Sequence, residues 1–212
     1  MQAKPDSYYA LARSPLLARL RRPVGRVLDV GCGEGGNAGE LRAAGATRLV
    51  GVEVMAGPAE QARTRFDDVR FGDALTELLR LEESFDTLLA YDVLEHLADP
   101  RAVLDRMREV AAPGAVLHVS TPNARHWSLM RDVLFRGTFG YTEWGHRDIT
   151  HLRWFTRRDL DALLRATGWV PTAWRASAED LLELKRVPGR RWFPRIGSEL
   201  GAVQWSVLAD AA

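Results

Sequence analysis

The chain has 212 residues, of which 46% are hydrophobic and 27% are charged, and its formal net charge is +1. These values fit a single globular domain with one substantial core, and the near-neutral charge gives no general attraction to nucleic acid. No apolar run approaches the length that spans a bilayer, and the first six residues lack the apolar core of a secretory signal, so we expect a cytoplasmic protein.

The first predicted element lies in residues 7–22, where apolar residues recur at spacings that fit one or two short helices. Pro15 would divide these helices, because a proline in a helix interior removes a backbone hydrogen bond. The simplest expectation is that they pack on the edge of a sheet.

A strand, a tight turn and a helix are predicted next, beginning with the run VLDVGCGEGG at residues 27–36. Gly31, Gly33 and Gly36 have the G-x-G-x-x-G spacing, in which glycine permits positive φ and lets a ligand lie against bare backbone. Glu53 follows the next apolar run, where a carboxylate would accept hydrogen bonds from a ribose diol. Loop and acid together indicate an adenosine ligand, and both NAD and S-adenosylmethionine contain one.

Short apolar runs alternate with helical patterns from residue 27 onward, which is typical of a parallel sheet covered on both faces. The predicted strands are 27–30, 49–52, 69–71, 85–91, 116–120, 170–175 and 202–208. Asp99 and Pro100 would begin a helix whose apolar stripe is Val103, Leu104, Met107 and Val110. Thr156 and Asp159 have the spacing of a capping box at the start of another helix.

Asp29 favours one of the two adenosine ligands, because a carboxylate there would repel a pyrophosphate and attract an ammonium and a sulfonium. At this point the sequence resembles the class I S-adenosylmethionine-dependent methyltransferases over about residues 8–175. The likeness rests on residues 27–35, Glu53, FGDA at 71–74 and FDTLLAYDVLEH at 85–96. It implies an α/β fold with a Rossmann-like, seven-stranded, mostly parallel sheet of order 3-2-1-4-5-7-6, an antiparallel last strand and helices on both faces.

The resemblance also implies how the methyl donor, S-adenosyl-L-methionine, and its product, S-adenosyl-L-homocysteine, would bind. Glu53 would accept from the ribose hydroxyls, Asp73 would accept from the adenine amino group, and Tyr91 would offer its carbonyl to the methionine ammonium. Met55 would pack against adenine, and Cys32, the only cysteine, would fill space beside the donor rather than act as a nucleophile. The predicted donor-binding residues are Asp29, Gly31, Cys32, Gly33, Glu53, Val54, Met55, Asp73, Ala74 and Tyr91.

Residues 122–155 are expected to bind the acceptor, because a connection of this length that is rich in aromatic residues, histidine and glycine is often functional. Its pattern resembles a subgroup of small bacterial methyltransferases associated with glycans, lipids or secondary metabolites. We predict that His146, Asp148 and His151 are catalytic and form a base and its orienting partner. The alternative is that His151 and Arg153 only tie this segment to the sheet.

Asp92, Glu95 and His96 form a second polar group in the sequence. On a helix these positions would share a face and could present oxygen and nitrogen ligands to a divalent metal ion. The quinone O-methyltransferases carry a similar string implicated in metal binding, but such residues also occur in methyltransferases that have no metal. We therefore predict no metal site, and zinc is further disfavoured by the ligand spacing and the lack of cysteines.

Two further segments are expected to add structure to the sheet and its covering helices. The resemblance implies that residues 7–22 form an N-terminal helical lid over the donor. Residues 176–201 are too long for a tight turn and would form an elaborated connection to the last strand, with Gly189 or Gly197 in it. The basic and aromatic run 185–195 would either contact an anionic lipid or phosphorylated acceptor, or be a solvated loop.

We therefore predict that residues 1–212 form one methyltransferase domain that methylates an oxygen or nitrogen of a small-molecule or glycan-like acceptor. It would be a monomer or homodimer without a nucleic-acid partner. A nicotinamide-dependent oxidoreductase is one alternative, against which Asp29 and Asp73 argue. A protein that binds S-adenosylmethionine without catalysis is the other.

Overall fold

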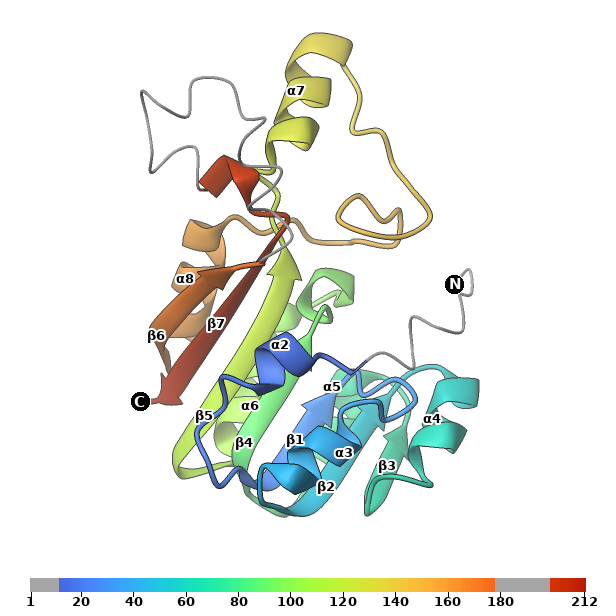
Figure 1. Ribbon diagram of the computed structural model, residues 1–212, viewed down its shortest axis with the longest axis vertical. Coiled ribbons are helices and arrows are strands. Elements are labelled where there is room, and N and C mark those ends of the chain that lie inside the picture. Colours follow the sequence, from blue (N-terminus) through green and yellow to red (C-terminus); the bar gives the residue numbers. More distant parts are fainter. Residues whose placement is uncertain (1–11, 178–198) are drawn as a thin grey trace.

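A computed structural model describes residues 12–177 and 199–212 (Figure 1). Within these residues the chain builds a seven-stranded sheet in the order β3-β2-β1-β4-β5-β7-β6. The first five strands pair in parallel, and the last strand runs antiparallel to both of its neighbours. The strands are β1 (Gly25–Val30), β2 (Ala46–Glu53), β3 (Asp68–Phe71), β4 (Phe85–Tyr91), β5 (Ala111–Pro122), β6 (Trp169–Ala176) and β7 (Gln204–Ala211). The predicted order and the reversed last strand are confirmed.

The central strands are apolar at consecutive positions because both faces of the sheet are covered. Leu28 of β1 lies beside Leu88 of β4, which lies beside Leu117 of β5, and all three side chains are fully buried. Since successive side chains of a strand point to opposite faces, such runs supply two apolar clusters, one on each face. Burial of each leucine contributes about 1.5–3 kcal/mol.

Helices cover the two faces of this sheet. The covering helices are α2 (Ser14–Leu17), α3 (Ala38–Ala43), α4 (Ala56–Ala62), α5 (Ala74–Leu79), α6 (Pro100–Glu109) and α8 (Arg157–Ala166). A 3₁₀ turn, η1 (Leu94–His96), follows β4, and α7 (Trp127–Arg136) lies beyond the end of the sheet (Figure 1). Side chains of α5, α6 and α8 enter one apolar cluster, and those of α2, α3 and α4 enter the other. None of the helices in the described ranges is long and apolar enough to cross a membrane.

Two predicted helix starts are confirmed. The Asp99 carboxylate accepts a hydrogen bond from the backbone N–H of Ala102 at 3.0 Å and caps α6. Thr156 and Asp159 exchange the reciprocal side-chain and backbone bonds of a capping box at the start of α8. Both caps supply partners to backbone N–H groups that a helix cannot satisfy internally.

Some predicted boundaries were wrong. The last strand was expected at 202–208 and instead spans Gln204–Ala211. The chain before it is bonded to Asn123, whose side chain donates to the carbonyl of Ala202 and whose backbone N–H donates to that of Val203. β5 also extends well beyond the expected residues 116–120 at both ends.

Other expectations concern the N-terminal segment and the connection to the last strand, which the structure describes only in part. Pro15 lies in the first turn of α2, and the helix expected before it falls in residues 7–11. The rest of the lid prediction, residues 7–11, lies outside the described residues. The same holds for Gly189, Gly197 and the basic run 185–195.

The segment between β5 and α8 leaves the sheet. Figure 1 shows α7 standing beyond the carboxyl end of β5, with the following chain curving back toward the sheet. Asn123 and Phe155 form a parallel bridge, and the backbone N–H of Ala124 donates to the carbonyl of Phe155 at 2.9 Å. The two ends of the predicted segment 122–155 therefore meet at its base.

Candidate functional site

A cavity of about 290 Å³ lies at the carboxyl ends of β1, β2 and β4, where open α/β sheets bind their ligands. Loops that follow these strands, together with β3 and the chain before α2, form its wall. The lining residues are Arg13, Val30, Gly31, Cys32, Gly33, Asn37, Val52, Glu53, Val54, Met55, Gly72, Asp73, Ala74, Tyr91, Asp92, Val93, His96 and Leu97. Every predicted donor-binding residue except Asp29 is among them.

The glycine loop after β1 bends sharply to open this cavity. Gly31 and Gly33 have φ angles of 75° and 56°, in the left-handed region that glycine adopts without strain. A β-carbon at Gly31 would lie 2.4 Å from Cγ2 of Val93, so there is no room for a side chain. The loop consequently presents bare backbone to the cavity.

Two acidic residues at strand ends have defined backbone contacts. The Glu53 carboxylate accepts from the backbone N–H groups of Gly33 and Met55, each at 2.9 Å, and so joins the loops after β1 and β2. Asp73 caps α5, accepting from the backbone N–H and hydroxyl of Thr76 through Oδ1. Its Oδ2 makes no hydrogen bond with any residue in the described ranges, which leaves an acceptor at the cavity wall.

Asp29 lies behind the cavity wall rather than in it, with a relative exposure of 1%. Its carboxylate accepts from the Asn37 side chain at 3.0 Å, and the Asn37 oxygen accepts from the backbone N–H of Arg13 at 2.9 Å. Burial raises the pKa of Asp29 to about 7. Asp29 therefore reaches the cavity through Asn37, a residue that was not predicted for the site.

Two other wall residues behave as packing groups through their side chains. The Cys32 thiol is buried, and burial raises its pKa far above the ordinary value, which disfavours a nucleophilic thiolate. The Tyr91 hydroxyl is 2.8 Å from Nδ1 of the buried His118. The Tyr91 side chain is therefore held against His118, and the role expected for its carbonyl stays a prediction.

Arg13 and Asp92 close the cavity on the side of α2 and were not predicted as donor-site residues. Their side chains form an ion pair at 2.8 Å. Asp92 has a φ angle of 56° and accepts hydrogen bonds from Ser120 at 3.0 Å and from Gln204. The sequence offered no signal for Arg13, because it meets Asp92 only after the chain has folded.

The backbone at Asp92 also contradicts the expectation that Asp92, Glu95 and His96 share one face of a helix. Only Leu94–His96 forms a short 3₁₀ turn, and Asp92 precedes it in a left-handed conformation. These residues therefore do not share the face of an α-helix.

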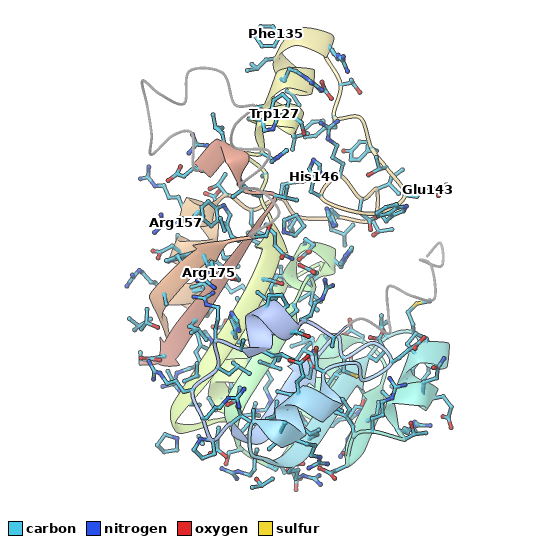
Figure 2. The ribbon with its side chains drawn as sticks, in the orientation of Figure 1. Trp127, Phe135, Glu143, His146, Arg157 and Arg175 are labelled. Atoms are coloured by element: carbon cyan, nitrogen blue, oxygen red, sulfur yellow. The ribbon has the colours of Figure 1, made fainter. Side chains whose placement is uncertain are left out.

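The predicted catalytic histidines have different neighbours. His146 packs against His126, with ring centroids 4.9 Å apart, and its Nε2 accepts from Nε of Arg147 at 3.3 Å. Burial, and then the charge of Arg147, lower the pKa of His146. Figure 2 shows His146 between α7 and the carboxyl ends of the strands. Its Nε2 lone pair is thus already engaged by Arg147.

His151 packs instead against His96, with ring centroids 4.8 Å apart, and against Trp154 at 5.6 Å. Asp148 is fully buried and accepts from the backbone N–H and the hydroxyl of Thr150, at 2.8 and 2.6 Å. His96 lines the cavity, so His151 lies one side chain away from it. The contact between His96 and His151 was not predicted, because 55 residues separate them in the chain.

Comparison with known proteins identifies several similar chains. A family model described as a methyltransferase domain matches residues 1–173. A ubiquinone biosynthesis O-methyltransferase of Azorhizobium caulinodans is 35% identical over 204 residues, which cover 91% of this chain and 71% of that protein. A "Probable S-adenosylmethionine-dependent methyltransferase" of Mycolicibacterium smegmatis is 35% identical over 132 residues, or 60% of this chain and 51% of that protein. This chain thus spans about half the length of the mycobacterial relative.

The fold also resembles solved structures. A SAM-dependent methyltransferase from Archaeoglobus fulgidus superimposes with a TM-score of 0.67 at 18% identity, and the match covers 97% of both chains. At this identity the likeness concerns the fold alone.

Proposed function

The chain belongs to the S-adenosylmethionine-dependent methyltransferase family, and we propose that it transfers the donor's methyl group to a hydroxyl oxygen of a small-molecule acceptor. The observation that carries the proposal is the cavity that joins the glycine loop, Glu53 and Asp73 to His96, beside the segment 122–155. A donor in this cavity would face the segment that is long and varied enough to select an acceptor. Oxygen is favoured because a relative that matches 91% of this chain is named an O-methyltransferase.

In the proposed binding mode the adenosine lies between Glu53 and Asp73. The Glu53 oxygens each accept one backbone N–H group and keep lone pairs for the ribose hydroxyls. Asp73 accepts from the adenine amino group through Oδ2, while Val54 and Met55 lie against the ring. The methionine portion then extends along the glycine loop toward the carbonyl of Tyr91.

The reaction is an in-line displacement in which the carbon–oxygen bond forms as the carbon–sulfur bond breaks. The protein must align the acceptor, exclude water and allow the hydroxyl to lose its proton. Nε2 of His146 already accepts from Arg147, so we propose that the acceptor hydroxyl loses its proton next to His96 and His151 instead. His146 and Asp148 would instead maintain the shape of the acceptor segment.

Calorimetric titration and a transfer assay with isotopically labelled S-adenosylmethionine test this proposal. We expect S-adenosylhomocysteine to bind and NAD not to bind, and we expect label to appear on hydroxyl-bearing acceptors rather than on amines. Label found only on amine nitrogen would refute the proposed acceptor class. Binding of NAD without binding of S-adenosylhomocysteine would refute the donor, and donor binding without transfer to any acceptor would favour a non-catalytic protein.

Glu53→Ala tests the donor site directly. It removes an acceptor of two backbone bonds and of the proposed ribose bonds, so the affinity for S-adenosylhomocysteine should fall by about thirtyfold, equivalent to about 2 kcal/mol. Glu60→Ala is the matched control, because Glu60 is an exposed residue of α4 outside the cavity wall. Equal affinities of the two variants would exclude Glu53 from the site.

A further inference from the structure

Three side chains with metal-binding atoms meet beside the donor cavity. Glu95 and His96 lie in η1, and His151 comes from the acceptor segment; one ligand atom from each residue lies within 4.8 Å of the other two. Backbone bonds hold the two segments together, since the N–H groups of Leu152 and Arg153 both donate to the carbonyl of Glu95, at 2.8 and 3.0 Å. The grouping is therefore fixed by main-chain contacts as well as by side chains.

The contacts of His96 orient its ring as a metal ligand requires. Its Nδ1 is 3.2 Å from both the carbonyl and the hydroxyl oxygen of Thr150. The carbonyl can only accept, and the hydroxyl proton is donated to Asp148 at 2.6 Å, so His96 must carry its proton on Nδ1. Neutral His96 then has its lone pair on Nε2, and a histidine ligand commonly donates its other N–H to a carbonyl in this way.

We propose that Glu95, His96 and His151 bind one divalent transition-metal ion at the wall of the donor cavity. Two imidazoles and one carboxylate suit Zn²⁺, Mn²⁺, Fe²⁺ or Co²⁺ better than Mg²⁺ or Ca²⁺, which prefer oxygen ligands alone. Three protein ligands also leave coordination positions open for a substrate atom.

Asp92 is not part of this site, in contrast to the set of residues considered from the sequence. Its carboxylate is held by Arg13 at 2.8 Å and by Ser120 and Gln204. His151 takes the third position instead, and it lies 55 residues after His96 in the chain.

The role of the ion rests on the proposed function, although its binding does not. Because His96 lines the cavity, an open position on the ion would face an acceptor bound beside the donor. Coordination would lower the pKa of the acceptor hydroxyl and release its proton to water. The resulting oxygen anion then attacks the methyl carbon, the carbon–sulfur bond breaks, and the sulfonium becomes the neutral sulfur of S-adenosylhomocysteine.

The full chain, stripped of metal with a chelator, can be titrated with Zn²⁺, Mn²⁺ and Mg²⁺ in a calorimeter. We expect one Zn²⁺ or Mn²⁺ per chain and weaker binding of Mg²⁺. Loss of a supporting hydrogen bond costs a metal site about 10–100-fold, so loss of a direct ligand in Glu95→Gln or His151→Gln should cost about 100-fold or more. Asp92→Asn and His146→Gln, a histidine of the same segment, should retain the wild-type affinity.

Thermal unfolding of the same samples shows whether each variant is folded, and retained binding of S-adenosylhomocysteine shows it as well for variants of Glu95, His146 and His151, which do not line the donor cavity. Absence of transition-metal binding to the wild type would overturn the site, as would loss of binding in Asp92→Asn with retention in His151→Gln. Metal binding without methylation of any acceptor would leave the site intact and refute the proposed function. Full methyl transfer by the stripped protein would refute the role given to the ion.

Discussion

Single residues show how closely the donor cavity depends on backbone geometry. At Gly31 a side chain would combine an unfavourable positive φ with a contact of 2.4 Å to Val93. We expect Gly31→Ala to lower the free energy of unfolding by about 2 kcal/mol or more and to weaken binding of S-adenosylhomocysteine. Urea unfolding and calorimetric titration measure the two effects.

A glycine in a neighbouring helix provides the control for this prediction. Gly39 lies in α3, and a β-carbon added there meets no atom within 4 Å. Gly39→Ala should therefore raise the free energy of unfolding by about 0.5–1 kcal/mol. If both variants were equally stable, the close packing of Gly31 on Val93 would be contradicted.

Asp29 should make the stability of the domain depend on pH. Its native pKa is about 7 because it is buried, whereas an unfolded aspartate has a pKa of about 3.9. Between these values the native carboxyl holds a proton that the unfolded chain has released, so raising the pH through this window favours unfolding. This sign is opposite to that of a carboxylate in a salt bridge.

Asp29→Asn isolates that effect, because an asparagine oxygen can still accept from Asn37 but cannot ionise. Relative to the wild type, we expect the variant to gain on the order of 2–4 kcal/mol of unfolding free energy at pH 8. The gain should shrink as the pH approaches 4. Urea unfolding at both pH values measures it, and a gain that does not change with pH would show that Asp29 has an ordinary pKa.

At the scale of elements, Arg147 ties the chain that follows α7 back to this helix. Its guanidinium donates to Asp132 at 2.8 Å and to Ser128 at 3.0 Å, both in α7, and to His146. We expect Arg147→Ala to raise KM for the acceptor by about tenfold or more, as for loss of a charged hydrogen bond. The Kd for S-adenosylhomocysteine should not change, because Arg147 does not line the donor cavity.

Arg147→Lys sharpens this prediction, since a lysine keeps the charge but cannot make the same set of bonds. Its acceptor KM should lie between those of the wild type and Arg147→Ala. Steady-state kinetics with each substrate varied in turn separates the two constants. A matching loss of donor affinity in both variants would show that α7 supports the donor site instead.

The elements themselves were predictable from the sequence where their causes are local. Apolar runs such as that around Leu28 mark buried strands, and the helix starts at Asp99 and Thr156 depend on residues within one turn. The start of the last strand was misplaced because Asn123, from a distant part of the chain, bonds to the residues before it. Boundaries set by such long-range contacts leave no periodic pattern.

At the scale of the whole molecule, the same distinction applies to the site. Glu53 and Asp73 could be located because parallel strands bring their carboxyl ends to one edge of the sheet. Arg13 joins that edge only through the chain before α2, and His151 reaches His96 only because the acceptor segment folds back. Sequence spacing suggested Asp92 as the companion of Glu95 and His96, but its left-handed backbone takes it out of their turn and its carboxylate is paired with Arg13.

Because the cavity wall comes from the carboxyl ends of β1, β2 and β4 and from the loops after β1, β2, β3 and β4, a ligand that bridges these parts should stabilise the entire domain. S-adenosylhomocysteine at 100 times its Kd should add about 2.7 kcal/mol to the free energy of unfolding. For a chain of this size that corresponds to a rise in Tm of about 5–10 °C. Scanning calorimetry of the wild type and Glu60→Ala should give equal rises, whereas NAD should give none. An unchanged Tm, at concentrations shown by titration to saturate the protein, would mean that the cavity lies outside the cooperatively folded core.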